Sequence, residues 1–195
     1  DPGTSEFVAK LIHEIRASVI ARPGWKIVEF DKAQQEYRVL VCLANCRESI
    51  KIINGGMDIH LKAVEASGTT GLDYSQLQTV YNTGGSVTIF GQSHKLKDVR
   101  NVFKNIVYGV AYGQGPDMTK AHLHTAGIEV SLAQANRIQY AILMSKPDIV
   151  RWQRENKAFL HRHGYVQTYH GRRIWYPDVR HEWHTKVAEA ERSAG

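Results

Sequence analysis

The sequence has no apolar run long enough to cross a bilayer, because charged residues interrupt its longest hydrophobic stretches. Its first seven residues, DPGTSEF, are not the basic-then-apolar pattern of a signal peptide, and we interpret residues 1–7 as a tag or linker. Cysteine is scarce. Cys42 and Cys46 are four positions apart, and no second pair at zinc-ligand spacing accompanies them. We therefore expect small buried thiols in a reducing compartment rather than a zinc site.

Internal repeats and low-complexity tracts are also missing, and 43% of the 195 residues are hydrophobic. This fraction can form a sizeable core, which argues against disorder and indicates one domain or slightly more. Lysine and arginine total 25 against 19 acidic residues, so the formal net charge is +6. That charge is compatible with a polyanionic partner but does not by itself identify one.

Hydrophobic periodicity predicts a mainly α (α+β) fold, in which helices are accompanied by a small amount of strand. Helical spacing covers residues 8–20, 34–46, 57–66, 95–112, 131–144, 147–163 and 182–194. Residues 25–30 (WKIVEF) predict a short buried strand. Two hairpins are expected, one pairing residues 80–81 with 87–90 and the other pairing 165–169 with 172–176.

One predicted helix carries four residues at intervals of four: Arg100, Lys104, Tyr108 and Tyr112. Each step turns the helix by about 400°, so the row drifts by about 40° per step and stays on one face. Such a face offers two cations that can hold a triphosphate and two rings that can stack on a base or sugar. Spacing alone favours the alternative, an ordinary amphipathic helix with solvated cations.

Asp31 directly follows the apolar segment WKIVEF and precedes a predicted helix. A carboxylate at such a junction suits Mg²⁺, because this ion favours hard oxygen ligands and substrate phosphates. Aspartate is also a common helix N-cap, and the junction taken alone favours that alternative.

Taken together, the two patterns resemble family A DNA polymerases. The first palm motif of that family is matched by Asp31, Gln34, Glu36 and Arg38, and its fingers motif by Arg100, Lys104, Tyr108, Gly109, Tyr112 and Gly113. Further agreement lies in residues 58–60 (DIH), 164–168, 171–173, 177–178 and 190–194. The resemblance covers about residues 16–195. It favours a nucleotide-binding face over an ordinary amphipathic helix for the four-residue row, and a Mg²⁺ ligand over a helix N-cap for Asp31.

The resemblance implies a role for each matching residue. Asp31 would be catalytic and bind two Mg²⁺ ions, with the backbone carbonyl of Lys32 as a further metal ligand. The incoming deoxynucleoside triphosphate would contact Gln34, Glu36, His60, Arg100, Lys104 and Tyr108. Among these, Glu36 would exclude ribose, and Lys104 would be a catalytic acid near the leaving pyrophosphate. Primer-template DNA would contact Tyr112, Gly113, Arg172, Arg173 and Arg192.

The sequence also departs from the family pattern. The His-Asp-Glu triplet that carries the second metal-binding aspartate does not occur. Two-metal phosphoryl transfer needs carboxylates on both sides of the metals, so we expect this chain alone to be nearly or wholly inactive. The implied organisation is a partial palm over residues 8–66, a variable hairpin insertion over 67–93, fingers over 94–180 and the start of a second palm segment over 181–195.

The implied activity is template-directed DNA synthesis by a longer parent polymerase. Two alternatives stay open: a fragment of a single-subunit RNA polymerase, against which Glu36 and the hairpin around Gly171 argue, and a non-catalytic nucleic-acid-binding module. We expect the missing palm and thumb segments as partners, self-association through the surfaces they would cover, and no membrane partner. The expected location is the cytoplasm of a bacterial or phage-infected cell, with an organelle as the alternative.

Overall fold

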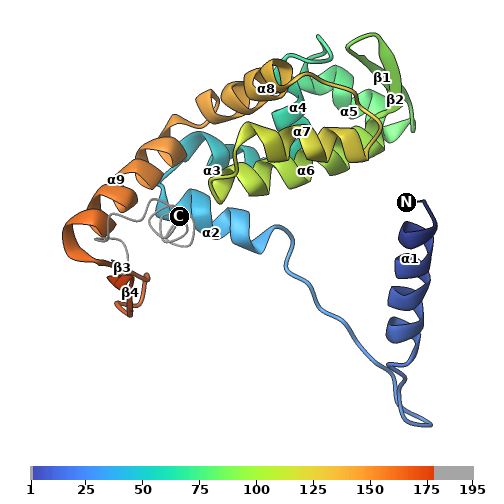
Figure 1. The fold of residues 1–195 in the computed structure, drawn as a ribbon, viewed down its shortest axis with the longest axis horizontal. Helices are drawn as coiled ribbons and strands as arrows, with labels where there is room; N and C mark the ends of the chain where they lie inside the picture. Colours follow the sequence, from blue (N-terminus) through green and yellow to red (C-terminus); the bar gives the residue numbers. More distant parts are fainter. Residues whose placement is uncertain (1, 178–195) are drawn as a thin grey trace. The chain divides into compact units, whose positions relative to one another are not determined.

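The structure is a computed structural model that describes residues 2–177 (Figure 1). The predicted helix at 182–194 and the predicted DNA contact Arg192 lie outside the described residues. The chain divides into two units, residues 1–34 and residues 35–195. No helix in the described part of the chain is both long and apolar enough to span a membrane.

The first unit contains one helix, α1 (Pro2–Ala17), followed by a segment without regular structure. The predicted strand at residues 25–30 is not formed. A strand is stabilised by hydrogen bonds to a neighbouring strand, and residues 2–34 contain no second strand to pair with it. The apolar side chains of this segment are accordingly exposed, including Trp25 and Phe30.

The second unit is built mainly from helices, which confirms the predicted fold class. In chain order they are α2 (Gln35–Leu43), α3 (Arg47–Asn54), α4 (Ile59–Ser67), α5 (Tyr74–Asn82), α6 (Leu96–Ala111), α7 (Pro116–Thr125), α8 (Leu132–Met144) and α9 (Pro147–His163). Two antiparallel hairpins complete it: β1 (Ser86–Ile89) with β2 (Gln92–Lys95), and β3 (Tyr165–Gln167) with β4 (Arg173–Trp175). The second hairpin lies where the sequence predicted it.

The first hairpin was predicted with the wrong strands: residues 87–90 were expected to be its second strand, but residues 86–89 form its first strand. Val80 and Tyr81 belong to α5, and the hairpin instead turns at Phe90 and Gly91, both with positive φ. The α5 helix begins with a capping box in which the Asp73 carboxylate accepts from the Gln76 N–H, a signal that our sequence analysis overlooked. Helices α3 and α7 were also missed.

Helix α6 lies in the centre of the core and packs against α4, α5, α7 and α8. One of its faces is buried and apolar, with Val99, Phe103 and Ile106 fully enclosed. Burying each such side chain contributes about 1.5–3 kcal/mol, so this packing fixes the rotation of α6 about its axis. The row identified in the sequence flanks this buried face: Tyr108 still packs against the core, whereas Lys104 is exposed.

Candidate functional site

The four-residue row lies on one face of α6 and its C-terminal cap, as the spacing predicted. Arg100 and Tyr108 are half-buried, whereas Lys104 is exposed. Tyr112 follows the last helical residue, and its N–H donates to the carbonyls of Tyr108 and Gly109. Two cations and two phenol rings therefore follow one another from Arg100, within α6, to Tyr112, its C-cap.

Arg100 is held by an ion pair that the sequence analysis did not predict. Its Nε donates to Asp58 Oδ2 at 2.8 Å, and the two side chains are each only 20% exposed. Burial alone would raise the pKa of Asp58, but the hydrogen bond from Arg100 and the backbone N–H of His60 lower it below its ordinary value. Asp58 is the first residue of the triplet 58–60 (DIH), which also contains His60. Its position beside a predicted site residue is the sequence feature that could have identified Asp58 as part of the site.

His60 is buried beside the row, at the start of α4. Its ring centroid lies 6.0 Å from that of Tyr108, and its Nδ1 has no hydrogen-bond partner among the described residues. Burial lowers the pKa of His60 to about 4; Asp58 opposes this effect, while Arg100, Lys104 and Lys146 add to it. The imidazole is therefore neutral at pH 7, with the Asp58 carboxylate as well as three positively charged side chains near it.

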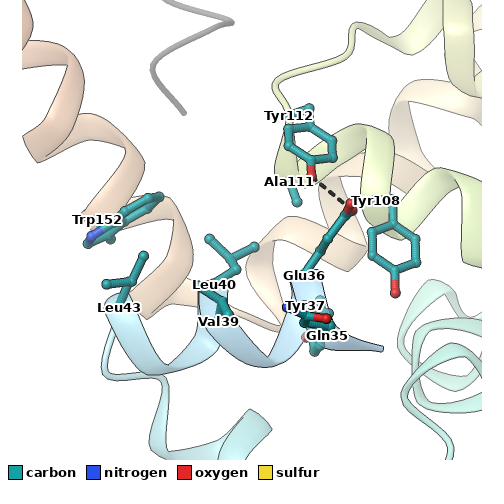
Figure 2. A pocket seen from close by; sticks show the side chains of 10 residues that line it. All are labelled: Gln35, Glu36, Tyr37, Val39, Leu40, Leu43, Tyr108, Ala111, Tyr112 and Trp152. Atoms are coloured by element: carbon teal, nitrogen blue, oxygen red, sulfur yellow. Dashed lines mark hydrogen bonds between the residues drawn. The ribbon is translucent and has the colours of Figure 1, made fainter. Parts of the chain in front are cut away.

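Glu36 and the end of the row line a cavity of about 290 Å³ (Figure 2). The Tyr112 hydroxyl donates to Glu36 Oε2 at 2.9 Å, which joins the loop after α6 to the first turn of α2. Burial and this bond to the carboxylate raise the pKa of Tyr112. Apolar side chains form most of the remaining wall: Tyr37, Val39, Leu40, Leu43, Ala111 and Trp152.

A second set of polar contacts fixes the C-terminal end of α6. Gln139 Nε2 donates to the Gln114 carbonyl at 2.6 Å, and Gln153 Nε2 donates to the Ala111 carbonyl at 2.7 Å. Gln114 Nε2 donates to Thr119 Oγ1 at 3.1 Å. An added Cβ at Gly109 would overlap the Gln114 side chain, so the space beside this glycine is already filled by the chain itself.

The remaining predicted site residues are distributed as follows. Asp31, Lys32 and Gln34 belong to the first unit, where Asp31 and Lys32 are exposed. Arg172 and Arg173 are exposed at the β3–β4 hairpin, where the Arg173 guanidinium lies 4.8 Å from the Tyr165 ring centroid. Gly113 adopts a φ of +78° after α6.

Metal-ligating side chains do not gather in the described residues. No group of three or more His, Cys, Asp or Glu side chains is arranged to hold an ion in this part of the chain. Asp31 suits Mg²⁺ as a single exposed carboxylate, but the described residues do not complete a two-metal centre.

The two cysteines differ in exposure. Cys46 is buried as expected, whereas Cys42 is exposed. Helix α2 ends at Leu43, so the two thiols do not share a helical face.

Comparison with known proteins places these features in a family. Residues 7–195 match the model of DNA polymerase family A. DNA polymerase I of Chloroflexus aurantiacus is 32% identical over 181 residues, which are 93% of this chain and 16% of that protein. Thermostable DNA polymerase I of Thermus aquaticus is 27% identical over 182 residues, 92% of this chain and 19% of that protein.

A solved structure has a similar fold: the POL domain of Pol1 from M. smegmatis, in complex with DNA primer-template and dNTP. The TM-score is 0.62 at 21% identity, and the similarity covers 84% of this chain and 24% of the other. The chain thus spans less than a fifth of the length of the two curated relatives named above. On the match of the family model over nearly the whole chain, this protein belongs to DNA polymerase family A.

Proposed function

We propose that this chain supplies the nucleotide-binding fingers, together with one metal-binding palm motif, of an enzyme that carries out template-directed DNA synthesis. The observation that carries the proposal is the cationic and aromatic row on α6 beside the buried His60. In this arrangement the chain binds a deoxynucleoside triphosphate for transfer to a primer 3′ end. Membership of the family and the likeness to a polymerase domain support it.

The positive side chains are suited to the triphosphate. Arg100 and Lys104 provide charge-assisted hydrogen bonds, which are stronger than bonds between neutral groups. His60 adds an uncharged imidazole whose Nδ1 has no partner among the described residues; because the ring is buried, its proposed bond to a phosphate oxygen requires it to become accessible when the nucleotide binds. Tyr108 lies one turn after Lys104 and near His60, which supports the proposed contact of its ring with the sugar.

The cavity beside Tyr112 supports the proposed role of Glu36 in excluding ribose. Because the Tyr112 hydroxyl holds the Glu36 carboxylate, this carboxylate has a defined place in the cavity wall. A side chain held in one place can exclude a 2′-hydroxyl sterically, by occupying the space that this group would need. Tyr112 and Gly113 would lie next to the templating base, and Arg172 and Arg173 would contact DNA phosphates.

We further propose that the complete enzyme uses two Mg²⁺ ions, to which this chain contributes the Asp31 carboxylate and the Lys32 carbonyl. Such ions supply electrostatic stabilisation of the transferring phosphate. The contribution of this chain to the reaction is binding and orientation of the triphosphate, with Lys104 placed as the proposed acid for the leaving pyrophosphate. Gln34 would be an additional nucleotide contact.

The test joins residues 7–195 to the remainder of the Chloroflexus aurantiacus DNA polymerase I, in place of the matching segment, and measures primer extension. We expect template-directed incorporation that falls about 100-fold or more in Lys104→Ala, in line with losing one preorganised charge at a transition state. Lys120→Ala, which removes an exposed lysine from α7, is the matched control. Full activity of Lys104→Ala would contradict the proposal.

A second readout of the same chimera addresses the sugar. Glu36→Ala is expected to increase ribonucleotide incorporation while leaving extension with deoxynucleotides measurable. Unchanged preference for deoxynucleotides would contradict the role proposed for Glu36.

A further inference from the structure

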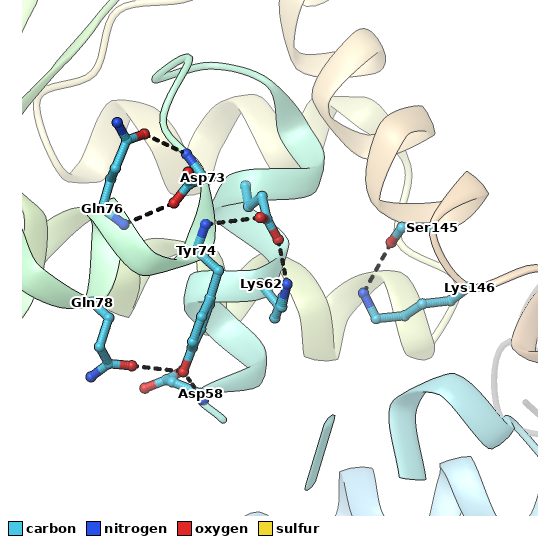
Figure 3. A network of polar contacts seen from close by, with 9 residues as sticks. Asp58, Lys62, Asp73, Tyr74, Gln76, Gln78, Ser145 and Lys146 are labelled. Carbon is cyan, nitrogen blue, oxygen red and sulfur yellow. Dashed lines mark hydrogen bonds and ion pairs between the residues drawn. The ribbon is translucent and has the colours of Figure 1, made fainter. Parts of the chain in front are cut away.

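Helix α5 is joined to the start of α4 by a polar network around Tyr74 (Figure 3). The Tyr74 hydroxyl accepts a hydrogen bond from the Asp58 backbone N–H at 2.9 Å and donates to Gln78 Oε1 at 2.6 Å. It therefore uses both an acceptor and a donor site, and its direction is fixed by two partners. α5 lies within residues 67–93, the segment that the sequence analysis interprets as an insertion.

Tyr74 itself is held in place by α4. Its backbone N–H donates to Glu65 Oε1 at 2.8 Å, and Glu65 Oε2 accepts from Lys62 Nζ at 2.8 Å. The Lys62 amino group in turn lies 4.8 Å from the centroid of the Tyr74 ring. The ring and the backbone of this tyrosine are thus anchored independently of its hydroxyl.

Asp58 connects this network to two proposed phosphate-binding groups. Its Oδ1 accepts from the backbone N–H groups of His60 and Leu61 at 2.8 and 3.2 Å, which caps α4. Its Oδ2 accepts from Arg100 Nε at 2.8 Å. One carboxylate therefore sets both the start of the helix that carries His60 and the position of the Arg100 guanidinium on α6.

We infer that Tyr74 is a positioning residue for triphosphate binding, which acts through Asp58 on Arg100 and His60. The inference rests on the proposed function. An arginine has many rotamers, and holding it in one before the ligand arrives lowers the entropy lost on binding. Removing the Tyr74 hydroxyl leaves the Asp58 N–H without this acceptor and loosens the turn from which the carboxylate reaches Arg100.

The test measures binding of dATP and dAMP, each with Mg²⁺, to the 195-residue chain by equilibrium dialysis. Tyr74→Phe is expected to weaken dATP binding roughly threefold to tenfold, the effect of losing one neutral hydrogen bond. Asp58→Asn is expected to weaken it roughly tenfold to a hundredfold, because a charge-assisted bond is lost. The dissociation constant for dAMP should stay close to that of the wild type in Tyr74→Phe, because dAMP has no β- or γ-phosphate.

Tyr140→Phe is the matched control, since it removes a hydroxyl from an exposed tyrosine on α8, and it should bind both nucleotides like the wild type. If Tyr74→Phe does not fold, Gln78→Ala removes the acceptor of the same hydroxyl and keeps the ring. We expect this variant to weaken dATP binding roughly twofold to threefold. Thermal unfolding of each variant is recorded alongside.

The outcomes separate the inference from the proposal on which it rests. If Arg100→Ala weakens dATP binding but Tyr74→Phe, or Gln78→Ala in its place, binds dATP like the wild type, the positioning role is overturned and the proposed function stands. Equal weakening of dATP and dAMP would also overturn it, because a general structural defect would have that effect. If the wild type binds dATP no more tightly than dAMP and Arg100→Ala changes neither, both claims are wrong.

Discussion

His60 combines full burial with a titratable ring, and this has a consequence for stability. Its pKa is lowered to about 4 by burial, with Asp58 opposing and nearby cations adding to the effect, against an ordinary value of 6.5. Between these values the unfolded chain binds the proton more readily than the folded chain does. Stability from the neutral imidazole is therefore complete above pH 6.5 and is lost progressively as the pH falls towards 4.

We accordingly expect the free energy of unfolding to decrease by at most about 3 kcal/mol through His60 as the pH falls from 6.5 to 4. Urea denaturation across this range should show a clearly shallower decrease in His60→Gln than in the wild type. His170→Gln, which alters an exposed histidine of the second hairpin, serves as the control and should keep the wild-type slope. Equal slopes for the wild type and His60→Gln would show that the burial of this ring is not as described.

At the residue scale, helix positions could be predicted from the sequence, but long-range side-chain contacts could not. The four-residue spacing located Arg100 and Tyr112 on one face, because helical geometry is local. It did not find their partners, since Asp58 precedes Arg100 by 42 positions and Glu36 precedes Tyr112 by 76. Glu36 and the triplet at 58–60 were recognised through the family resemblance, but neither pairing follows from a sequence pattern. Packing of separate helices decides which side chains meet.

At the scale of elements, the C-terminal end of α6 depends on a glycine. We expect Gly109→Ala to destabilise the chain by about 1–3 kcal/mol, because the new methyl group would displace the Gln114 side chain and its bond to Thr119. Gly115→Ala is the control: nothing lies within 4 Å of a Cβ there, and we expect a smaller loss. Chemical denaturation of both variants measures the difference. A Gly109→Ala protein as stable as the wild type would contradict the close approach of Gln114.

The starts of α8 and α9 were predicted from local signals, whereas the strand at residues 25–30 and the first hairpin, which depend on pairing, were not predicted correctly; the second hairpin was. The Ser131–Gln134 capping box marked the start of α8, and Pro147 marked that of α9. Residues 25–30 have the composition of a strand, yet a strand also requires a neighbour, which the described part of their unit does not provide. For the first hairpin, residues 82–85 (NTGG) were mistaken for the turn, whereas they contain the end of α5 and the link to β1.

For the molecule as a whole, the net charge of +6 and the exposed arginines of the second hairpin predict electrostatic binding of DNA. We expect the logarithm of the affinity for duplex DNA to fall linearly with the logarithm of the salt concentration, because bound phosphates release counterions. Replacing both Arg172 and Arg173 by alanine should reduce the slope by about 2 if each neutralises one phosphate. Fluorescence anisotropy measures both, with Arg47→Ala on α3 as the control; an affinity independent of salt would contradict this account.

The chain by itself should not extend a primer. Its sequence contains Asp31 but not the His-Asp-Glu triplet, and phosphoryl transfer between two metals requires carboxylates on both sides. With Mg²⁺, all four deoxynucleotides and a primer-template, we expect no product from this chain; the Thermus aquaticus DNA polymerase I serves as the positive control. Template-dependent product from the pure chain would mean that another carboxylate completes the centre.

The central claim is that the α6 row and His60 form the triphosphate site, and photolabelling tests it most directly. The chain is irradiated with 8-azido-dATP in the presence of Mg²⁺, and the labelled peptides are identified by mass spectrometry. Our account predicts labelling near Tyr108 and Tyr112, where rings are available to the base, with protection by excess dATP and strong reduction in Arg100→Ala. Labelling confined to the second hairpin, or labelling near α6 that neither dATP nor Arg100→Ala reduces, would contradict it.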